Sequence, residues 1–206
     1  MARLRYGTEL FQAATHSQAD RYPELFQECS RRLASILRPR VLSFGCSTGE
    51  EIASLAQYMP HAEMFGVDIN PWCLRQCRVK LKRSKVRLMH RFSREFLKLG
   101  ELDAIFCMAV FQRFEHRTEG WDPGQSGFTF ERFEAEVLLL DSKLRVGGLF
   151  FLDESDFSFQ MTTAAARYDP LDFDLNRLIR ERPLFDSANR LIARSSLFTR
   201  AFVKKA

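Results

Sequence analysis

Apolar and polar positions follow two different periods along this chain, and their alternation predicts an α/β protein. Short apolar runs with few charges are typical of buried strands, and such runs occur at 41–45, 63–68, 102–108 and 149–152. Apolar residues at helical spacing occur at 22–37, 50–59, 71–84 and 128–145. Residues 85–92 alternate between apolar and polar and predict a further strand.

The C-terminal part of the chain has weaker patterns. Gly147 and Gly148 are expected to end the helix at 128–145. Residues 164–182 predict a short helix around a proline. Residues 184–192 and 197–203 predict two strands joined by a turn.

One corner between a predicted strand and the next helix has the composition of a ligand site. Gly45 and Gly49 lack a Cβ atom, so the backbone there can adopt a positive φ and let a ligand approach closely. The helix that follows directs its free N–H groups back at this corner. Asp68 ends the next strand, where an acid can accept two hydrogen bonds from a ribose diol. These features predict a site for a nucleoside-containing cofactor; the alternative is an ordinary corner without a ligand.

The spacing of the corner distinguishes between cofactors. A dinucleotide loop has the pattern G-x-G-x-x-G, whereas residues 45–49 have G-x-S-x-G with Glu50 and Glu51 next. Two carboxylates at a helix N-terminus disfavour a pyrophosphate and suit a sulfonium or ammonium group. The segment 41–51 resembles motif I of the class I S-adenosylmethionine-dependent methyltransferases. The sequence of its loop is also similar to that of the chemotaxis-receptor glutamate methyltransferases. Residues 68–70 resemble the acidic motif that follows in that family, and residues 144–150 its L-K-P-G-G passage.

The resemblance implies a fold and a cofactor. The fold would be a three-layer α/β/α Rossmann-like methyltransferase fold with a mostly parallel seven-stranded sheet in the order 3-2-1-4-5-7-6 and a C-terminal antiparallel hairpin. The cofactor would be S-adenosyl-L-methionine, held by a methyltransferase domain at 41–206, with 1–40 as a helical cap or lid of the same domain. Residues 1–20 are either a frayed terminus or a lid over the cofactor that carries Tyr6, Phe11 and His16.

The family's motifs carry over to cofactor-binding positions at the ends of the first four strands. These positions are Phe44, Gly45, Cys46, Ser47, Gly49, Glu50, Asp68, Ile69, Phe92, Ser93, Cys107, Met108 and Ala109. The corner would surround the methionine part, and Asp68 would bind the ribose. Ile69, Phe92 and Ser93 would lie near the adenine, and residues 107–109 beside the sulfonium.

Two positions depart from the family pattern. Ser43 stands where the family has an acid two residues before the first glycine, so Glu50 is the candidate for contact with the cofactor's amino group. The acid that often follows the third strand is also absent, and Ser93 is its substitute.

An acceptor would enter just after the fourth strand, at Phe111, Arg113 and His116. His116 is the candidate general base because its ordinary pKa lies near neutrality; the alternative is a surface histidine. Asp153, Glu154 and Asp156 follow the fifth strand, as ligands of an amine or a metal, or as a solvated loop. The N/D-P-P-Y/F tetrapeptide of enzymes that methylate base amines does not occur, which argues against DNA as the acceptor.

Composition sets the remaining limits. The 206 residues and 24.0 kDa fit one domain, and 46% apolar residues indicate a globular chain. Five cysteines and no recognisable secretory leader lead us to expect reduced thiols and a cytoplasmic protein without a metal site. No apolar run is long enough to span a membrane.

The partner classes follow from the charge and the motifs. The acceptor is expected to be a small molecule or a side chain of a protein. The net charge of +5 and the basic stretch 75–94 leave two alternatives, an RNA methyltransferase or a solvated charged surface. A catalytically silent domain that binds the cofactor or a partner is the third interpretation. The sequence does not indicate an oligomeric state.

Overall fold

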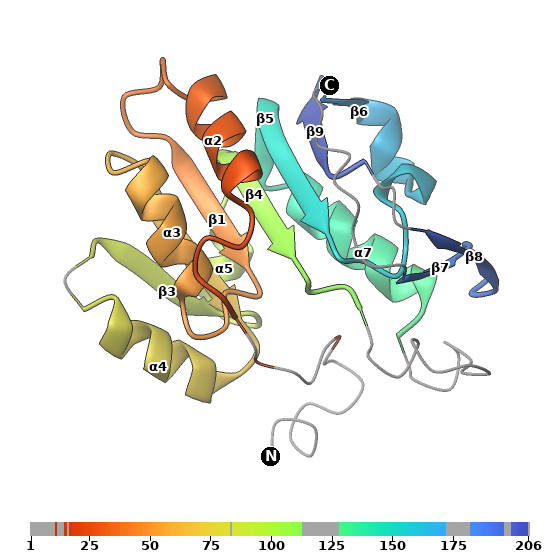
Figure 1. The fold of residues 1–206 in the computed structure, drawn as a ribbon, viewed down its shortest axis with the longest axis horizontal. Helices are drawn as coiled ribbons and strands as arrows, with labels where there is room; N and C mark the ends of the chain where they lie inside the picture. The colour runs from red at the N-terminus through yellow and green to blue at the C-terminus, as the bar shows by residue number, and fades with distance from the viewer. Residues whose placement is uncertain are drawn as a thin grey trace.

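The fold is built on one seven-stranded sheet (Figure 1). The computed structural model describes residues 11, 15, 17–82, 84–112, 128–171, 182–195 and 199–205, without the side chains of 182 and 193–195. The strands of the sheet are β1 (Arg40–Phe44), β2 (Glu63–Asp68), β3 (Val86–His90), β4 (Leu102–Met108), β5 (Leu144–Asp153), β6 (Tyr168–Pro170) and β9 (Ala201–Lys204). Their order across the sheet is β3-β2-β1-β4-β5-β9-β6.

The strand order confirms the expected fold class. The first five strands are parallel, and β9 runs antiparallel between β5 and β6. Because β6 and β9 are the sixth and seventh strands of this sheet along the chain, the order is the expected 3-2-1-4-5-7-6. The chain moves outward from β1 to β3 and then returns to β4 on the other side of β1. The carboxyl ends of β1 and β4 therefore meet at a switch point, which is where open α/β sheets bind ligands.

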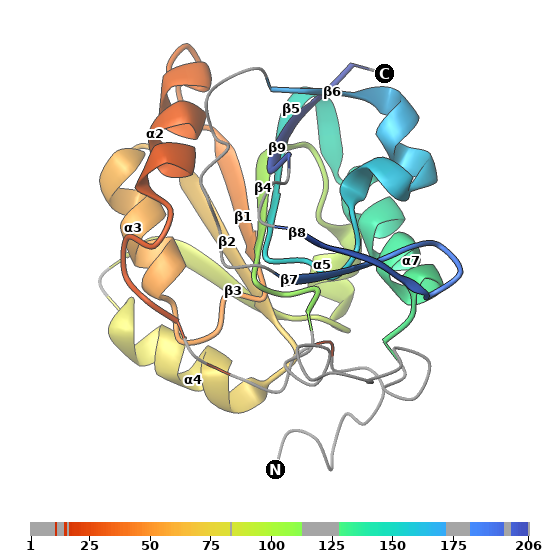
Figure 2. The same cartoon turned by 45° about the vertical axis from the view of Figure 1, so that its right-hand side comes forward.

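Helices cover both faces of the sheet and complete the three layers (Figures 1 and 2). One face packs against α2 (Pro23–Arg32), α3 (Glu50–Tyr58) and α4 (Pro71–Lys80). The other packs against α5 (Arg94–Lys98), α7 (Phe130–Asp141) and the 3-10 helices η3 (Phe159–Met161) and η4 (Thr163–Arg167).

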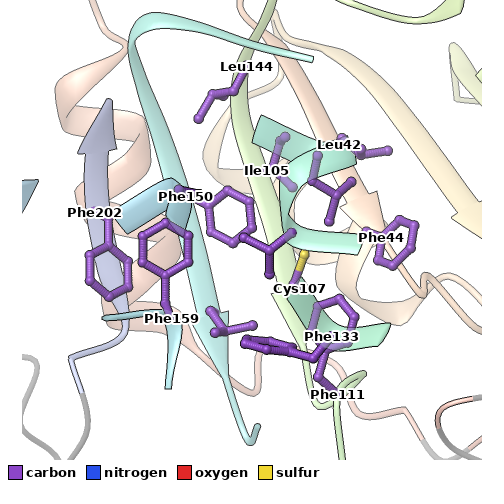
Figure 3. Packing of buried hydrophobic residues seen from close by; sticks show 14 of the residues in the cluster. Leu42, Phe44, Ile105, Cys107, Phe111, Phe133, Leu144, Phe150, Phe159 and Phe202 are labelled. Carbon is purple, nitrogen blue, oxygen red and sulfur yellow. The ribbon is translucent and has the colours of Figure 1, made fainter. Parts of the chain in front are cut away.

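Phenylalanine fills the core beneath α7 and η3. Phe150 of β5 packs on Phe159 of η3, and Phe159 packs on Phe202 of β9, with ring centroids 5.1 and 4.4 Å apart (Figure 3). Phe44 and Phe111 stack near the carboxyl ends of β1 and β4. Many of the 20 phenylalanines of the chain therefore lie in a packed interior.

Side-chain caps fix the starts of two helices next to the sheet edge that the carboxyl ends of the parallel strands form. Asn70 caps α4 by accepting a hydrogen bond from the Trp72 N–H at 3.0 Å, and Pro71 occupies the first helical position. Ser93 caps the short helix α5, which the sequence pattern did not predict, by accepting from the Phe96 N–H at 3.1 Å. Local side-chain bonds therefore set where the chain turns after β2 and β3.

Replacing Asn70 with alanine is expected to lower the free energy of unfolding by about 1 kcal/mol, because the Trp72 N–H then loses its acceptor. Urea denaturation measures this as a lower midpoint with an unchanged slope. Asn70→Ser keeps a capping oxygen and serves as the matched control. An alanine variant that unfolds at the same urea concentration as the wild type would show that the cap does not stabilise α4.

Two helices end earlier than the pattern predicts. The helix expected at 22–37 ends at Arg32, and the helix expected at 128–145 ends at Asp141. Gly147 and Gly148 do not end that helix; they lie within β5, where four residues bulge between the pairs Leu144–Leu102 and Leu149–Ala104. The positive φ of Gly147, 78°, belongs to this bulge.

The antiparallel end of the sheet is confirmed, but the residues that form it differ from those expected. Residues 184–192 do not form one strand, because the chain turns between β7 (Arg182–Phe185) and β8 (Leu191–Ser195), which form a separate two-stranded sheet. The Asp186 carboxylate accepts hydrogen bonds from the N–H groups of Ala188 and Arg190 and fixes this turn. The main sheet is closed by β6 and β9 instead. No helix in the described ranges combines the length and the apolar character needed to cross a membrane.

Candidate functional site

The glycine corner lies at the carboxyl end of β1, held tightly between its neighbours. The N–H groups of Gly45 and Cys46 both donate to the Val67 carbonyl of β2, at 2.8 and 3.0 Å. Gly45 has φ 75°, and a Cβ atom there would lie 2.5 Å from Cγ2 of Val110. Gly49 has φ 95° and immediately precedes α3. The corner thus requires glycine for its own backbone conformation and for packing against neighbouring side chains.

Asp68 connects this corner to the loop after β2. Its Oδ2 atom accepts from the Ser47 N–H at 2.8 Å, and its Oδ1 atom accepts from the Asn70 N–H at 2.7 Å. Burial raises the pKa of Asp68 above its ordinary value, although these bonds act in the opposite direction. A carboxylate has about four acceptor sites, so two protein bonds leave capacity for a diol.

The two acids at the start of α3 have different surroundings. Glu50 pairs with Lys80, and its Oε2 atom accepts from the Thr48 hydroxyl at 2.6 Å. Burial opposes ionisation of Glu50, but the bonds from Lys80 and Thr48 outweigh it and lower its pKa. Glu51 instead accepts from the Ser43 hydroxyl of β1 at 2.7 Å, and burial raises its pKa to about 7.

Sequence reasoning chose Glu50 as the substitute for the missing acid and did not consider Glu51. The structure places Glu51, not Glu50, against Ser43, the position where the family has that acid. The sequence did contain a signal for Glu51. Ser43 replaces the family's acid, and Glu51 is a second acid in the first turn of the next helix.

The positions expected near an adenine lie at the ends of β2 and β3. The Ile69 carbonyl lies 2.9 Å from Nε2 of His90, which joins these two strand ends. Phe92 is 50% exposed and packs its ring beside His90, with centroids 5.8 Å apart. The Ser93 hydroxyl caps α5. These residues are brought together at one edge, next to Asp68.

At the end of β4, mainly backbone atoms lie at the sheet edge that the carboxyl ends of the parallel strands form. Cys107 is fully buried in the core under α7, and burial raises the pKa of its thiol well above the ordinary range. Met108 is buried on the opposite face. Ala109 has φ 60° and donates its N–H to the Asp153 carbonyl at 2.9 Å. Of the three, Ala109 is the partly exposed residue.

The expected acceptor residues are only partly described. Phe111 is fully buried, with its ring against those of Phe11, Phe44 and Phe133, so the structure assigns it to the core. Arg113 and His116 lie outside the described residues. Their roles as acceptor ligand and general base stay predictions.

The acids after β5 have protein partners. Glu154 pairs with Arg21 and accepts from the Gln112 amide at 3.2 Å, and Asp153 pairs with Arg200 at 3.1 Å. In the part of the chain that the structure describes, no three His, Cys, Asp or Glu side chains are grouped to hold a metal ion. Asp153 and Glu154 thus serve as ion-pair partners rather than as a solvated loop.

Two described residues of the N-terminal segment reach this edge. The Thr15 carbonyl accepts from the Ser47 hydroxyl at 2.8 Å. The Phe11 ring lies 5.2 and 5.3 Å from the rings of Phe111 and Phe128. Tyr6 and His16 lie outside the described residues. Phe11 and Thr15 thus contact the protein near the ends of β1 and β4, and the role of 1–20 as a lid stays a prediction.

The basic stretch 75–94 is partly neutralised. Lys80, Arg87 and Arg91 form ion pairs with Glu50, Glu63 and Glu136, respectively. Arg83 lies outside the described residues. These pairs favour the charged-surface interpretation over a nucleic-acid track.

Part of the chain is similar in sequence to known proteins. Residues 41–121 match the family model described as a methyltransferase domain. A Synechococcus sp. protein, named only as an uncharacterized protein, is 32% identical over 104 residues, which are 48% of this chain and 25% of that protein. This chain therefore spans about a quarter of that relative's length.

Two solved structures illustrate the structural similarity. One is the S-adenosylmethionine-bound amino pentose methyltransferase of Micromonospora echinaspora, with a TM-score of 0.48, 20% identity, and coverage of 67% of this chain and 51% of that chain. The other is the precorrin-6y C5,15-methyltransferase of Geobacter metallireducens, with a TM-score of 0.45, 20% identity, and coverage of 68% and 66%.

Proposed function

We propose that this chain carries a methyltransferase domain of the class I type and transfers a methyl group from S-adenosylmethionine to a small-molecule or side-chain acceptor. The observation that carries the proposal is Asp68, which lies at the carboxyl end of β2 with its carboxylate bonded to the glycine corner. Its spare acceptor sites suit a ribose diol, and the residues around it fit the rest of an adenosyl sulfonium.

Each neighbour of Asp68 has a role in this proposal. The backbone of the corner at 44–49 surrounds the methionine part, and the positive φ of Gly45 and Gly49 sets the course of that backbone. Ile69 and the exposed ring of Phe92 pack against the adenine, and Ser93 lies beside it. The backbone at 107–109 lines the side of the sulfonium. Cytoplasmic location stays a prediction.

Methyl transfer from a sulfonium requires mainly that the protein align the two reactants. In the bound cofactor the methyl group is attached to a sulfonium sulfur, and the thioether is a good leaving group. The protein aligns the acceptor for in-line attack and excludes water from the site. A neutral hydroxyl or amine acceptor must also lose a proton, and His116 is the candidate base.

Calorimetric titration with S-adenosylhomocysteine and with NAD tests the proposal. We expect S-adenosylhomocysteine to bind at one site per chain and NAD not to bind, because the carboxylates of Glu50 and Glu51 repel a pyrophosphate at the start of α3. Binding of NAD without S-adenosylhomocysteine would instead indicate an oxidoreductase cofactor.

RNA is the alternative acceptor, and one observation favours it. Trp72 is 56% exposed beside the basic residues of α4, and an exposed aromatic ring can stack on an unpaired base. Retention on RNA that falls steeply with salt would support this alternative. A protein that binds the cofactor and methylates neither class of acceptor would correspond to the catalytically silent interpretation.

A further inference from the structure

We propose that Glu51 and Tyr22 form the subsite for the amino-acid end of the cofactor, with the Glu51 carboxylate binding its ammonium group. The inference rests on the proposed function, because it names the residues that hold one end of that cofactor. It replaces Glu50, the residue that sequence reasoning chose.

The first observation is the position of the Glu51 carboxyl group. Glu51 lies in the first turn of α3, and Ser43 lies on β1 just before the glycine corner. The Ser43 hydroxyl donates to Oε1 of Glu51 at 2.7 Å. Within the described part of the chain, Oε2 has no hydrogen-bond partner and Glu51 has no ion-pair partner. A partly buried acid with one oxygen atom left over is suited to a cationic group brought by a ligand.

The second observation is the hydroxyl group of Tyr22, just before α2. Tyr22 is only 7% exposed, and its hydroxyl has no hydrogen-bond partner among the described residues. Leaving a buried hydroxyl unpaired destabilises a folded protein, so a ligand that supplies the missing partner is favoured. Burial, and then the negative charges of Glu154, Asp153 and Glu51, raise the pKa of Tyr22, so the hydroxyl stays protonated.

The two groups together fit a zwitterion. The Glu51 carboxylate can pair with an ammonium group, and the protonated Tyr22 hydroxyl can donate to a carboxylate or accept from the ammonium. Tyr22 belongs to the hydrophobic cluster on the sheet face covered by α2 and α3, which also contains Cys46 of the corner. Glu51 lies in the first turn of α3 against Ser43. Glu50 is less suited, because Lys80 and Thr48 already occupy its carboxylate.

The charges around Glu51 determine a pH dependence. The titratable groups whose charges interact with that of Glu51 are Arg21, Tyr22 and Cys46, and Cys107 across the sheet. Burial raises the pKa of Glu51 to about 7 in the free protein. A bound ammonium favours the ionised form, so affinity should rise as the pH increases through 7 and level off above it. Below that pKa, affinity should fall by up to about tenfold per pH unit, because binding must release a proton.

Two ligands and three variants test the inference by calorimetry. S-Adenosylhomocysteine carries the amino-acid end, and 5′-methylthioadenosine is the same nucleoside thioether without it. Glu51→Gln keeps an oxygen that accepts from Ser43 and removes the charge. We expect it to lower the affinity for S-adenosylhomocysteine roughly 10- to 100-fold and to leave 5′-methylthioadenosine unchanged. The pH dependence between 6 and 8, tested with buffers about one unit either side of the pKa, should disappear in this variant. Tyr22→Phe should show the same ligand selectivity with a smaller loss.

Other outcomes overturn the inference in distinguishable ways. An equal loss for both ligands would show that Glu51 only shapes the corner. A selective loss in Glu50→Gln, with Glu51→Gln behaving as the wild type, would restore the sequence-based choice. If the wild type binds neither ligand, the proposed function fails together with this subsite.

Discussion

Replacing Asp68 with alanine is expected to lower the affinity for S-adenosylhomocysteine about 10- to 150-fold, the equivalent of about 1.5–3 kcal/mol for bonds to a charged acceptor. The reason is that Asp68 is the carboxylate at the end of β2 with acceptor sites left over after its bonds to Ser47 and Asn70. Calorimetry on the folded variant measures the effect, with a melting curve to show that the fold persists.

Asp68 also shapes the corner, so the measurement needs a ligand control. The 2′-deoxy analogue of 5′-methylthioadenosine lacks one ribose hydroxyl, and the parent compound has both. If Asp68 binds the diol, the variant should lose more affinity for the parent than for the deoxy analogue. An equal loss for both would show that Asp68 acts only through the Ser47 and Asn70 backbone, and would contradict the ribose assignment.

Replacing Gly45 with valine is expected to abolish detectable binding of S-adenosylhomocysteine and to lower the free energy of unfolding by about 1–3 kcal/mol. A β-branched residue is strained at the φ of 75° found there, and its Cβ atom would lie 2.5 Å from Val110. The loss of stability follows from the structure, because Val110 already occupies the space that the sequence pattern reserves for a ligand.

Gly100 provides the matched control for that substitution. A Cβ atom at Gly100 would meet no other atom within 4 Å, so Gly100→Val should unfold at nearly the wild-type urea concentration and bind normally. A Gly45→Val protein with the stability and affinity of the wild type would contradict both the strain and the role of the corner.

Several features of the fold were predictable because they depend on short stretches of chain. The apolar runs at 63–68 and 102–108 coincide with β2 and β4 as the structure has them. Both strands lie in the middle of a parallel sheet. Helices cover both faces of such a sheet, so most side chains on either face must be apolar. The glycine corner and Asp68 could be recognised for a similar reason, since a tight turn and a strand end restrict the residue types that fit.

Other features depend on which segments pack together, and the patterns there were misleading. A glycine pair after a helix resembles a helix end, but Gly147 and Gly148 form a bulge because β5 begins at Leu144, opposite Leu102. Phe111 follows β4, at the position where a residue that binds the acceptor is expected. Neighbouring rings from three other segments nevertheless bury it. Neither outcome has a signal within a few residues of the position concerned.

The sequence by itself determined the turn that requires glycine and the carboxylate at the end of β2. Its resemblance to a known family gave the strand order. Only the tertiary structure decided which acid faces Ser43, because Glu50 and Glu51 are adjacent in the chain and equivalent in type. The helix rotation directs Glu51 toward β1 and leaves Glu50 to Lys80 and Thr48. Local residue type sets what a side chain can bind, whereas packing sets which partner it meets.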